Sequence, residues 1–290
     1  MAIERTVVYK IDDQAIHVKE EGPADRQVAL FIHGWSSSWY ALSPIFQEFN
    51  RRYRVMAVDL PGYGESPRMK ERATIPAYAD LLAKLIREVT DKPIVLIGHS
   101  MGGMISLTLT LRHPELVERM ILICPTISGK LSMFINMFVS PITFLERSVI
   151  TNRFISAFEP YFIQITDRLM RPASFADRTE IKEDEYTHLR ADARRPGQGR
   201  VRAECYRAMR ENDLRGKLSQ VNKPALVIWG MEDNTVPLRD ASVVATEWPD
   251  ADLRMIPNAG HWPQFETPVI TRRYVKAFMG TPVKLLNLEF

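Results

Sequence analysis

The stretch from Ile94 to Leu109 constrains the fold more than any other part of the chain. It begins with a short run of β-branched and aliphatic residues and breaks at Gly98-His99-Ser100-Met101-Gly102-Gly103. It then continues with residues that can follow a helix. The pattern predicts a strand, a sharp turn and a helix, in that order.

The spacing Gly98-x-Ser100-x-Gly102 is what a nucleophilic serine at such a turn requires. The serine must adopt a strained backbone to expose its hydroxyl, and side chains two residues before and after it would clash. At the start of the following helix, free N–H groups and the helix dipole favour negative charge, so an oxyanion formed there is stabilised. The turn is therefore suited to acyl transfer, although the pentapeptide alone also fits a purely structural glycine-rich turn.

Apolar runs and helical patterns alternate on both sides of this turn, which is typical of a mostly parallel α/β sheet. An opening hairpin is expected from alternating residues around a polar turn, and the other strands from continuous apolar runs. The expected strands cover residues 6–10, 15–20, 28–32, 54–60, 94–97, 117–124, 224–230 and 251–256, and the expected helices cover 76–90, 101–112, 238–246 and 267–279.

The rhythm is interrupted once, by a segment without a convincing buried strand. We interpret residues 126–222 as an inserted helical cap between two parts of one core, 1–125 and 223–290. Apolar residues at helical spacing between Met133 and Met170 either pack this cap onto the core or line a pocket. The following arginines, from Arg190 to Arg215, alternate with acidic residues, which predicts a solvated helix face.

Composition excludes several classes of protein. The 290 residues are 46% hydrophobic and carry a net charge of only +3, which argues against a nucleic-acid-binding protein. We find neither the apolar core of a secretory signal nor an uninterrupted apolar run of about 18 residues, so export and membrane insertion are not expected. The two distant cysteines suggest neither a disulfide framework nor a metal cluster, which fits a cytoplasmic protein best.

A nucleophilic serine needs a base, usually histidine, and an acid that orients the base. Among the six histidines, His261 lies in a loop between the last expected strand and the last expected helix, where its side chain reaches the strand ends. For the acid, the segment 230–237 offers the neighbours Glu232 and Asp233, and periodicity does not separate them.

Five motifs in this order resemble the α/β-hydrolase superfamily, in its cap-bearing branch. They are His33-Gly34-Trp35, the segment 59–66 (DLPGYGES), the segment 98–103, Gly230-x-x-Asp233 and Gly260-His261. The resemblance implies an eight-stranded, mostly parallel sheet flanked by helices, and a catalytic triad of Ser100, Asp233 and His261.

The resemblance also assigns smaller roles around the triad. The oxyanion hole would consist of the backbone N–H groups of Trp35 and Met101. His33 would brace its loop without transferring protons, and Asp59 would belong to a structural turn. No metal or organic cofactor is implied. Cys124 ends an expected core strand, and this position predicts that packing buries it.

The reaction implied is hydrolysis of a small carboxylic ester with a hydrophobic acyl group, as in carboxylesterases and lipases. Epoxide hydrolases and haloalkane dehalogenases of this fold carry aspartate where this chain has Ser100, which disfavours their chemistry. Three alternatives stay open: a thioesterase, a carbon–carbon bond hydrolase, which often has asparagine in place of His99, and a ligand receptor built on this fold. The apolar tail 283–290 is expected to pack on the body or on a second copy of the chain, as in a homodimer.

Overall fold

The computed structural model contains one eight-stranded sheet in the order β1-β2-β4-β3-β5-β6-β7-β8. The structure describes residues 4–133, 135–137, 171, 174–177, 179–193, 195 and 198–282. The strands are β1 (Arg5–Ile11), β2 (Gln14–Glu21), β3 (Val28–Ile32), β4 (Arg54–Val58), β5 (Ile94–His99), β6 (Val117–Ile123), β7 (Ala225–Gly230) and β8 (Asp252–Ile256). Neighbouring strands from β4 to β8 pair in parallel, and β2 pairs antiparallel with both β1 and β4. The expected fold class is confirmed.

Burial explains why the central strands read as continuous apolar runs. Every residue of β3, β5 and β7 is buried, because these strands are covered on both faces. The outer hairpin of β1 and β2 instead alternates between buried and more exposed positions. The carboxyl ends of the parallel strands share one edge of the sheet, and loops that leave this edge meet there.

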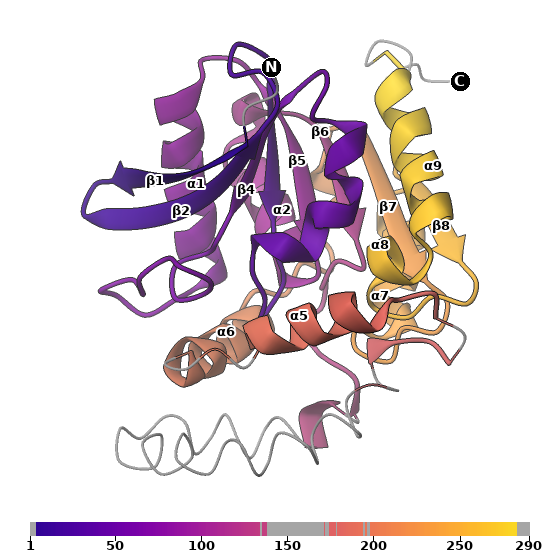
Figure 1. Ribbon diagram of the computed structural model, residues 1–290. Coiled ribbons are helices and arrows are strands. Elements are labelled where there is room, and N and C mark those ends of the chain that lie inside the picture. The colour runs from indigo at the N-terminus through magenta and orange to yellow at the C-terminus, as the bar shows by residue number, and fades with distance from the viewer. Residues whose placement is uncertain are drawn as a thin grey trace.

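Helices cover both faces of this sheet. Figure 1 shows α2 behind the sheet and α9 in front of it. The helices that flank the sheet are the 3₁₀ segment η1 (Trp39–Glu48), α1 (Ile75–Val89), α2 (Met101–Arg112), α7 (Leu238–Glu247), α8 (Pro263–Glu266) and α9 (Pro268–Gly280), with short 3₁₀ turns η2 (Pro114–Leu116) and η3 (Leu218–Gln220). α1 packs against α2, whereas η1 packs against β3, β4 and α9.

The expected helix over 267–279 corresponds to α9 within one residue at each end, but the turn before it was not expected. A separate turn, α8, precedes it and ends at Glu266, and α9 then starts at Pro268. Each of the two helices begins with a proline, Pro263 or Pro268, which has no N–H to leave unbonded in a first turn. η1 has no counterpart among the helices expected from the sequence.

Between β6 and β7 the structure describes two helices, α5 (Glu183–Ala193) and α6 (Gly199–Glu211). Figure 1 shows both lying across one end of the sheet. Most of the apolar groups expected to form the cap, such as Phe144, Phe154 and Phe162, lie outside the described residues, and so does the tail 283–290. The division of the chain at residues 126 and 222 therefore stays a prediction.

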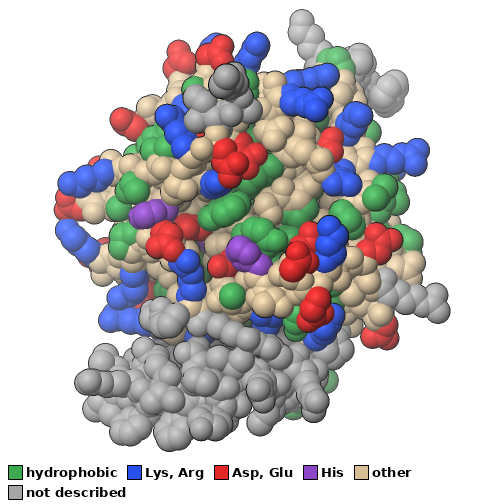
Figure 2. All heavy atoms as spheres, viewed as in Figure 1, with side chains coloured by type: hydrophobic (Ala, Val, Ile, Leu, Met, Phe, Trp, Pro, Cys, Tyr) green, Lys and Arg blue, Asp and Glu red, His purple; other side chains and the backbone are tan. Residues whose placement is uncertain are grey.

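The surface agrees with the small net charge of the chain. Figure 2 shows acidic and basic side chains interspersed over the described part of this face. Within the described part of the chain, we find no helix that combines the length and the apolar character needed to cross a bilayer.

Candidate active site

Ser100 occupies the turn between β5 and α2 in a strained backbone conformation. Its φ is 55° and its ψ is −116°, a combination that side-chain-bearing residues rarely adopt. A Cβ on Gly102 would lie 2.0 Å from the carbonyl oxygen of Ile32, and one on Gly98 would lie 2.6 Å from that of Gly102. Gly102 is therefore required by the close packing of the turn against the end of β3, and Gly98 by its close packing against α2.

Asp233 and His261 form a buried hydrogen-bonded pair. Nδ1 of His261 lies 2.8 Å from Oδ2 of Asp233, and both side chains are almost fully buried. Oδ1 of Asp233 accepts the N–H groups of Thr235 at 2.8 Å and Val236 at 2.9 Å, which fixes the carboxylate. Because an ionised carboxylate only accepts, Nδ1 carries the proton, and Nε2 is left as an acceptor. The neighbouring Glu232 is exposed, so Asp233 and not Glu232 is the buried carboxylate bonded to His261.

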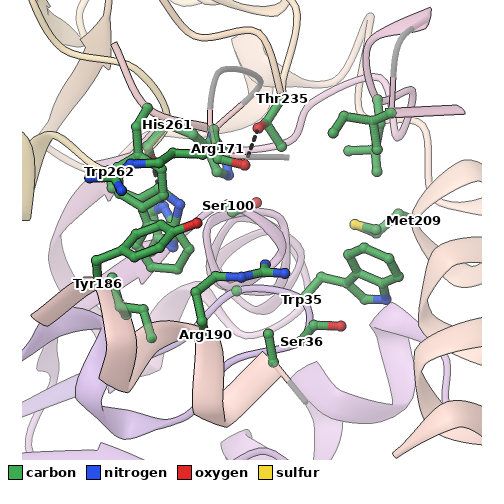
Figure 3. A pocket seen from close by; sticks show the side chains of 18 residues that line it. Trp35, Ser36, Ser100, Arg171, Tyr186, Arg190, Met209, Thr235, His261 and Trp262 are labelled. Atoms are coloured by element: carbon green, nitrogen blue, oxygen red, sulfur yellow. Dashed lines mark hydrogen bonds between the residues drawn. The ribbon is translucent and has the colours of Figure 1, made fainter. Parts of the chain in front are cut away.

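Ser100 and His261 line one pocket, although they are far apart in the sequence. Figure 3 shows Ser100 near the centre of this pocket and His261 to one side of it. Ser100 follows β5, Asp233 follows β7 and His261 follows β8, so all three lie at the shared carboxyl edge of the sheet.

The two backbone groups expected to stabilise an oxyanion flank Ser100. Met101 is the first residue of α2, where N–H groups have no partner within the helix. Trp35 follows Gly34, and a Cβ on Gly34 would lie 3.0 Å from the Cβ of Ser100. Trp35 also lines the pocket, and its indole N–H donates to the carbonyl of Arg202 at 2.8 Å.

Other motif residues support loops around the pocket. His33 accepts the N–H of Leu60 at its Nε2, 3.0 Å away, and burial lowers the pKa of His33 to about 4. Oδ1 of Asp59 accepts the N–H of Trp39 at 2.9 Å, and Oδ2 accepts that of Glu65 at 2.9 Å. Both His33 and Asp59 are buried and bonded to neighbouring loops.

His99 links the serine turn to the loop that carries His261. Its Nε2 donates to the carbonyl oxygen of His261 at 2.8 Å, and burial pushes the pKa of His99 well below its ordinary value. The ring is therefore neutral, with an unprotonated Nδ1 that has no partner within the described part of the chain. The sequence alone offered no signal for this bond, because it joins the last residue of β5 to a loop that follows β8, 162 residues later in the chain.

The pocket is largely apolar but also contains arginine. Its apolar lining comprises Trp35, Leu131, Ile135, Phe175, Leu189, Ala193, Met209 and Trp262. Arg190 and Arg171 line it too, and no acidic side chain does so in the described part of the chain. Figure 3 shows the side chain of Arg190 extending across the pocket towards Trp35. The expectation of a solvated helix face is wrong at Arg190, because α5 directs this side chain into the pocket. Burial there lowers the pKa of the Arg190 guanidinium.

Two other arginines of this segment, Arg200 and Arg207, lie on a solvated helix face as expected. Arg200 pairs with Glu204, Arg207 with Glu211, and these guanidinium groups are about half exposed. Arg171 lies 4.4 Å above the ring of Tyr186 and 3.4 Å from a carboxylate oxygen of Glu183 at the pocket rim.

A group of potential metal ligands lies beside the acid and base. Atoms of Cys124, Asp233 and His261 lie within 4.8 Å of one another, and all three residues are buried. Burial raises the pKa of the Cys124 thiol well above its ordinary value, so the thiol is protonated and a poor ligand. Nδ1 of His261 is already bonded to Asp233. The chemistry of this donor set therefore favours a hydrogen-bonded pair with a packed thiol.

A family model described as the alpha/beta hydrolase fold matches residues 28–268. The chain belongs to this family. Among curated relatives of this alpha/beta hydrolase, the Bacillus subtilis protein "Uncharacterized hydrolase YugF" is 28% identical over 284 residues, which cover 93% of this chain and 96% of that protein. A 2-hydroxy-6-oxononadienedioate/2-hydroxy-6-oxononatrienedioate hydrolase of Burkholderia vietnamiensis is 27% identical, with coverage of 91% and 90%.

Among solved structures, a thermophilic esterase from Thermogutta terrifontis with malate bound superposes on this hydrolase with a TM-score of 0.77. The two are 22% identical, and the match covers 98% of this chain and all of that one. At this identity the likeness establishes the fold and no more.

Proposed function

We propose that this chain is a serine hydrolase that cleaves a carboxylic ester with a hydrophobic acyl group through an acyl-enzyme intermediate. One observation carries the proposal: a strained, pocket-lining Ser100 shares its pocket with His261, whose Nδ1 is bonded to a buried carboxylate. The apolar lining supports a hydrophobic acyl group.

In the proposed first half-reaction, Nε2 of His261 takes the proton of the Ser100 hydroxyl as its oxygen attacks the ester carbonyl. Asp233 holds the imidazole in the required tautomer and stabilises the imidazolium. The N–H groups of Trp35 and Met101 donate to the oxyanion of the tetrahedral intermediate. The intermediate expels the alcohol, which receives the proton from His261, and leaves the acyl group on Ser100.

The second half-reaction repeats these steps with water. His261 deprotonates a water molecule, whose oxygen attacks the acyl carbonyl. The new tetrahedral intermediate releases the carboxylic acid, and the proton returns to the Ser100 oxygen. No other group is needed to balance the two steps.

The test uses p-nitrophenyl esters of graded acyl length with the wild type and Ser100→Ala. We expect release of p-nitrophenolate by the wild type, a preference for medium-length acyl chains over acetate, and background rates for the variant. Equal rates for the wild type and the variant would remove the triad assignment.

A second candidate, carbon–carbon bond hydrolysis, is favoured by the arginines in the pocket. Arg190 and Arg171 suit a substrate that carries a carboxylate, as the name of the Burkholderia vietnamiensis relative describes for that enzyme. The residue before Ser100 argues against carbon–carbon hydrolysis, because this chain has His99 where such hydrolases often have asparagine.

Turnover of a 2-hydroxy-6-oxo dienoate, followed by the loss of its absorbance, separates the two candidates. If carbon–carbon hydrolysis is the reaction, kcat/KM for the dienoate exceeds that for every neutral ester, and Arg190→Gln lowers only the former. If ester hydrolysis is the reaction, the order is reversed and the dienoate is turned over slowly.

A further inference from the structure

Glu266, the last residue of α8, places a fully buried carboxylate beside the loop that carries His261. Its Oε2 accepts the N–H of Gly260 at 3.0 Å and that of Ala176 at 2.7 Å. Its Oε1 accepts the N–H of Trp262 at 2.8 Å. Two of these three donors are the residues immediately before and after His261. A buried carboxylate is costly unless its lone pairs are used, and here both oxygens bind main-chain donors.

The charge state of Glu266 depends on this environment. Burial raises its pKa to about 7, whereas the three N–H groups and the nearby His261 act in the opposite direction. The negative charge of Glu266 also helps to raise the pKa of the Cys124 thiol, which lies directly after β6. The ionised form accepts the three N–H groups with charge assistance, whereas protonation replaces one lone pair with an O–H donor and removes that charge.

The remaining main-chain groups of His261 are fixed as well. Its N–H donates to the carbonyl of Ser174 at 2.8 Å, and its own carbonyl accepts Nε2 of His99 at 2.8 Å. A Cβ on Gly260 would lie 2.9 Å from both the oxygen of Ser174 and the nitrogen of Ala176. The loop therefore packs directly against the segment 174–176, and Glu266 bonds to both.

We propose that Glu266 is a positioning residue for His261. Its carboxylate accepts the N–H groups on both sides of this base and that of Ala176, and these bonds keep the imidazole between Asp233 and the pocket. This inference rests on the proposed serine-hydrolase function and adds a residue to it. Glu266 acts through the main chain of the loop and does not touch the substrate.

Glu266→Gln tests the inference at constant side-chain size. The amide has one acceptor oxygen, and its NH₂ group must face at least one of the three N–H donors. We expect the imidazole to lose its alignment, which lowers kcat by about 10- to 100-fold. KM for a small ester should change by less than about threefold, because Glu266 is not among the residues that line the pocket.

The neighbouring Gln264 provides a matched control. It is equally buried in α8, but its amide donates to the carbonyl of Ala41 in η1 and not to the His261 loop. Gln264→Leu perturbs the packing of the same short helix. If Glu266 mattered only for packing, Gln264→Leu and Glu266→Gln would lower activity alike. We expect kcat of Gln264→Leu to stay within about threefold of the wild type.

The decisive measurement is the rate of Ser100 phosphorylation by diethyl p-nitrophenyl phosphate, followed by release of p-nitrophenolate. This reagent reports how well His261 activates Ser100 without requiring the natural substrate. We expect Glu266→Gln to react about 10-fold or more slowly than the wild type, with faster hydrogen exchange in peptides that cover 174–177 and 258–262. Wild-type rates of phosphorylation in Glu266→Gln would overturn the inference.

Two further outcomes keep the result unambiguous. If wild type and Ser100→Ala react alike with the reagent, the proposed function fails first. If Glu266→Gln does not fold, Glu266→Asp replaces it. This variant keeps the charge but is one methylene too short to reach all three donors, so slower phosphorylation supports the inference and an unchanged rate refutes it.

Discussion

The strained turn at Ser100 predicts that removing its Cβ stabilises the protein. At φ 55° and ψ −116°, a side chain clashes with its own backbone, whereas glycine adopts this region without such a clash. We therefore compare Ser100→Gly with Ser100→Ala. Both variants lose the hydroxyl and all activity that depends on it, and they differ only in the Cβ that causes the strain.

The expected magnitude follows from two opposing effects. A side chain in a sparsely populated backbone region costs about 1–3 kcal/mol. Glycine makes the unfolded chain more flexible than alanine does, which costs about 0.5–1 kcal/mol. Ser100→Gly should accordingly be more stable than Ser100→Ala by up to about 2.5 kcal/mol, although both variants are inactive.

The assay is urea unfolding followed by tryptophan fluorescence, with free energies compared at equal m-values. Ser242, an exposed residue inside α7, provides the control pair. There Ser242→Gly should be less stable than Ser242→Ala by about 1 kcal/mol, because the position is helical. If glycine is the less stable substitution at both positions, the argument from strain is wrong.

Three further predictions concern the site and its surroundings. Asp233→Asn should lower kcat for p-nitrophenyl butyrate by about 10³- to 10⁴-fold, because an amide that donates to Nδ1 favours the wrong tautomer of His261; an unchanged kcat would contradict the pairing. Gly102→Ala, whose Cβ would lie 2.0 Å from a carbonyl oxygen of β3, should cost about 3 kcal/mol or more in urea unfolding. Gly280→Ala, with nothing within 4 Å, should leave stability nearly unchanged. The carboxyl of Glu266 has an ordinary pKa of 4.5 and a folded pKa of about 7, so its contribution to stability is fully present below pH 4.5 and is lost as the pH rises through 7. Between pH 5 and pH 8 the wild type should therefore lose roughly 2–3 kcal/mol more than Glu266→Gln does in urea unfolding, and parallel losses would refute the raised pKa.

The sequence by itself determined the eight strands, the main helices that flank the sheet and the turn at Ser100. These features depend on neighbours within a few positions: continuous apolar runs produce buried strands, and two glycines within five residues permit the serine turn. The family motifs then indicated Asp233 and His261. In the structure, Oδ2 of Asp233 lies 2.8 Å from Nδ1 of His261. Periodicity without the motifs left Glu232 and Asp233 equivalent, since adjacent residues share the same local pattern.

Only the tertiary structure decided which side chains surround the site. Arg190 reads as one of many charged residues, yet the orientation of α5 turns it into the pocket. Glu266 reads as an ordinary acidic residue near a helix end, yet its carboxylate is fully buried and bonded to Ala176, 90 residues earlier in the chain. Such contacts join segments that are distant in sequence, and local propensity carries no information about which of them meet. Burial, charge state and pocket lining therefore arise from packing between elements, whereas the elements themselves arise from the local pattern.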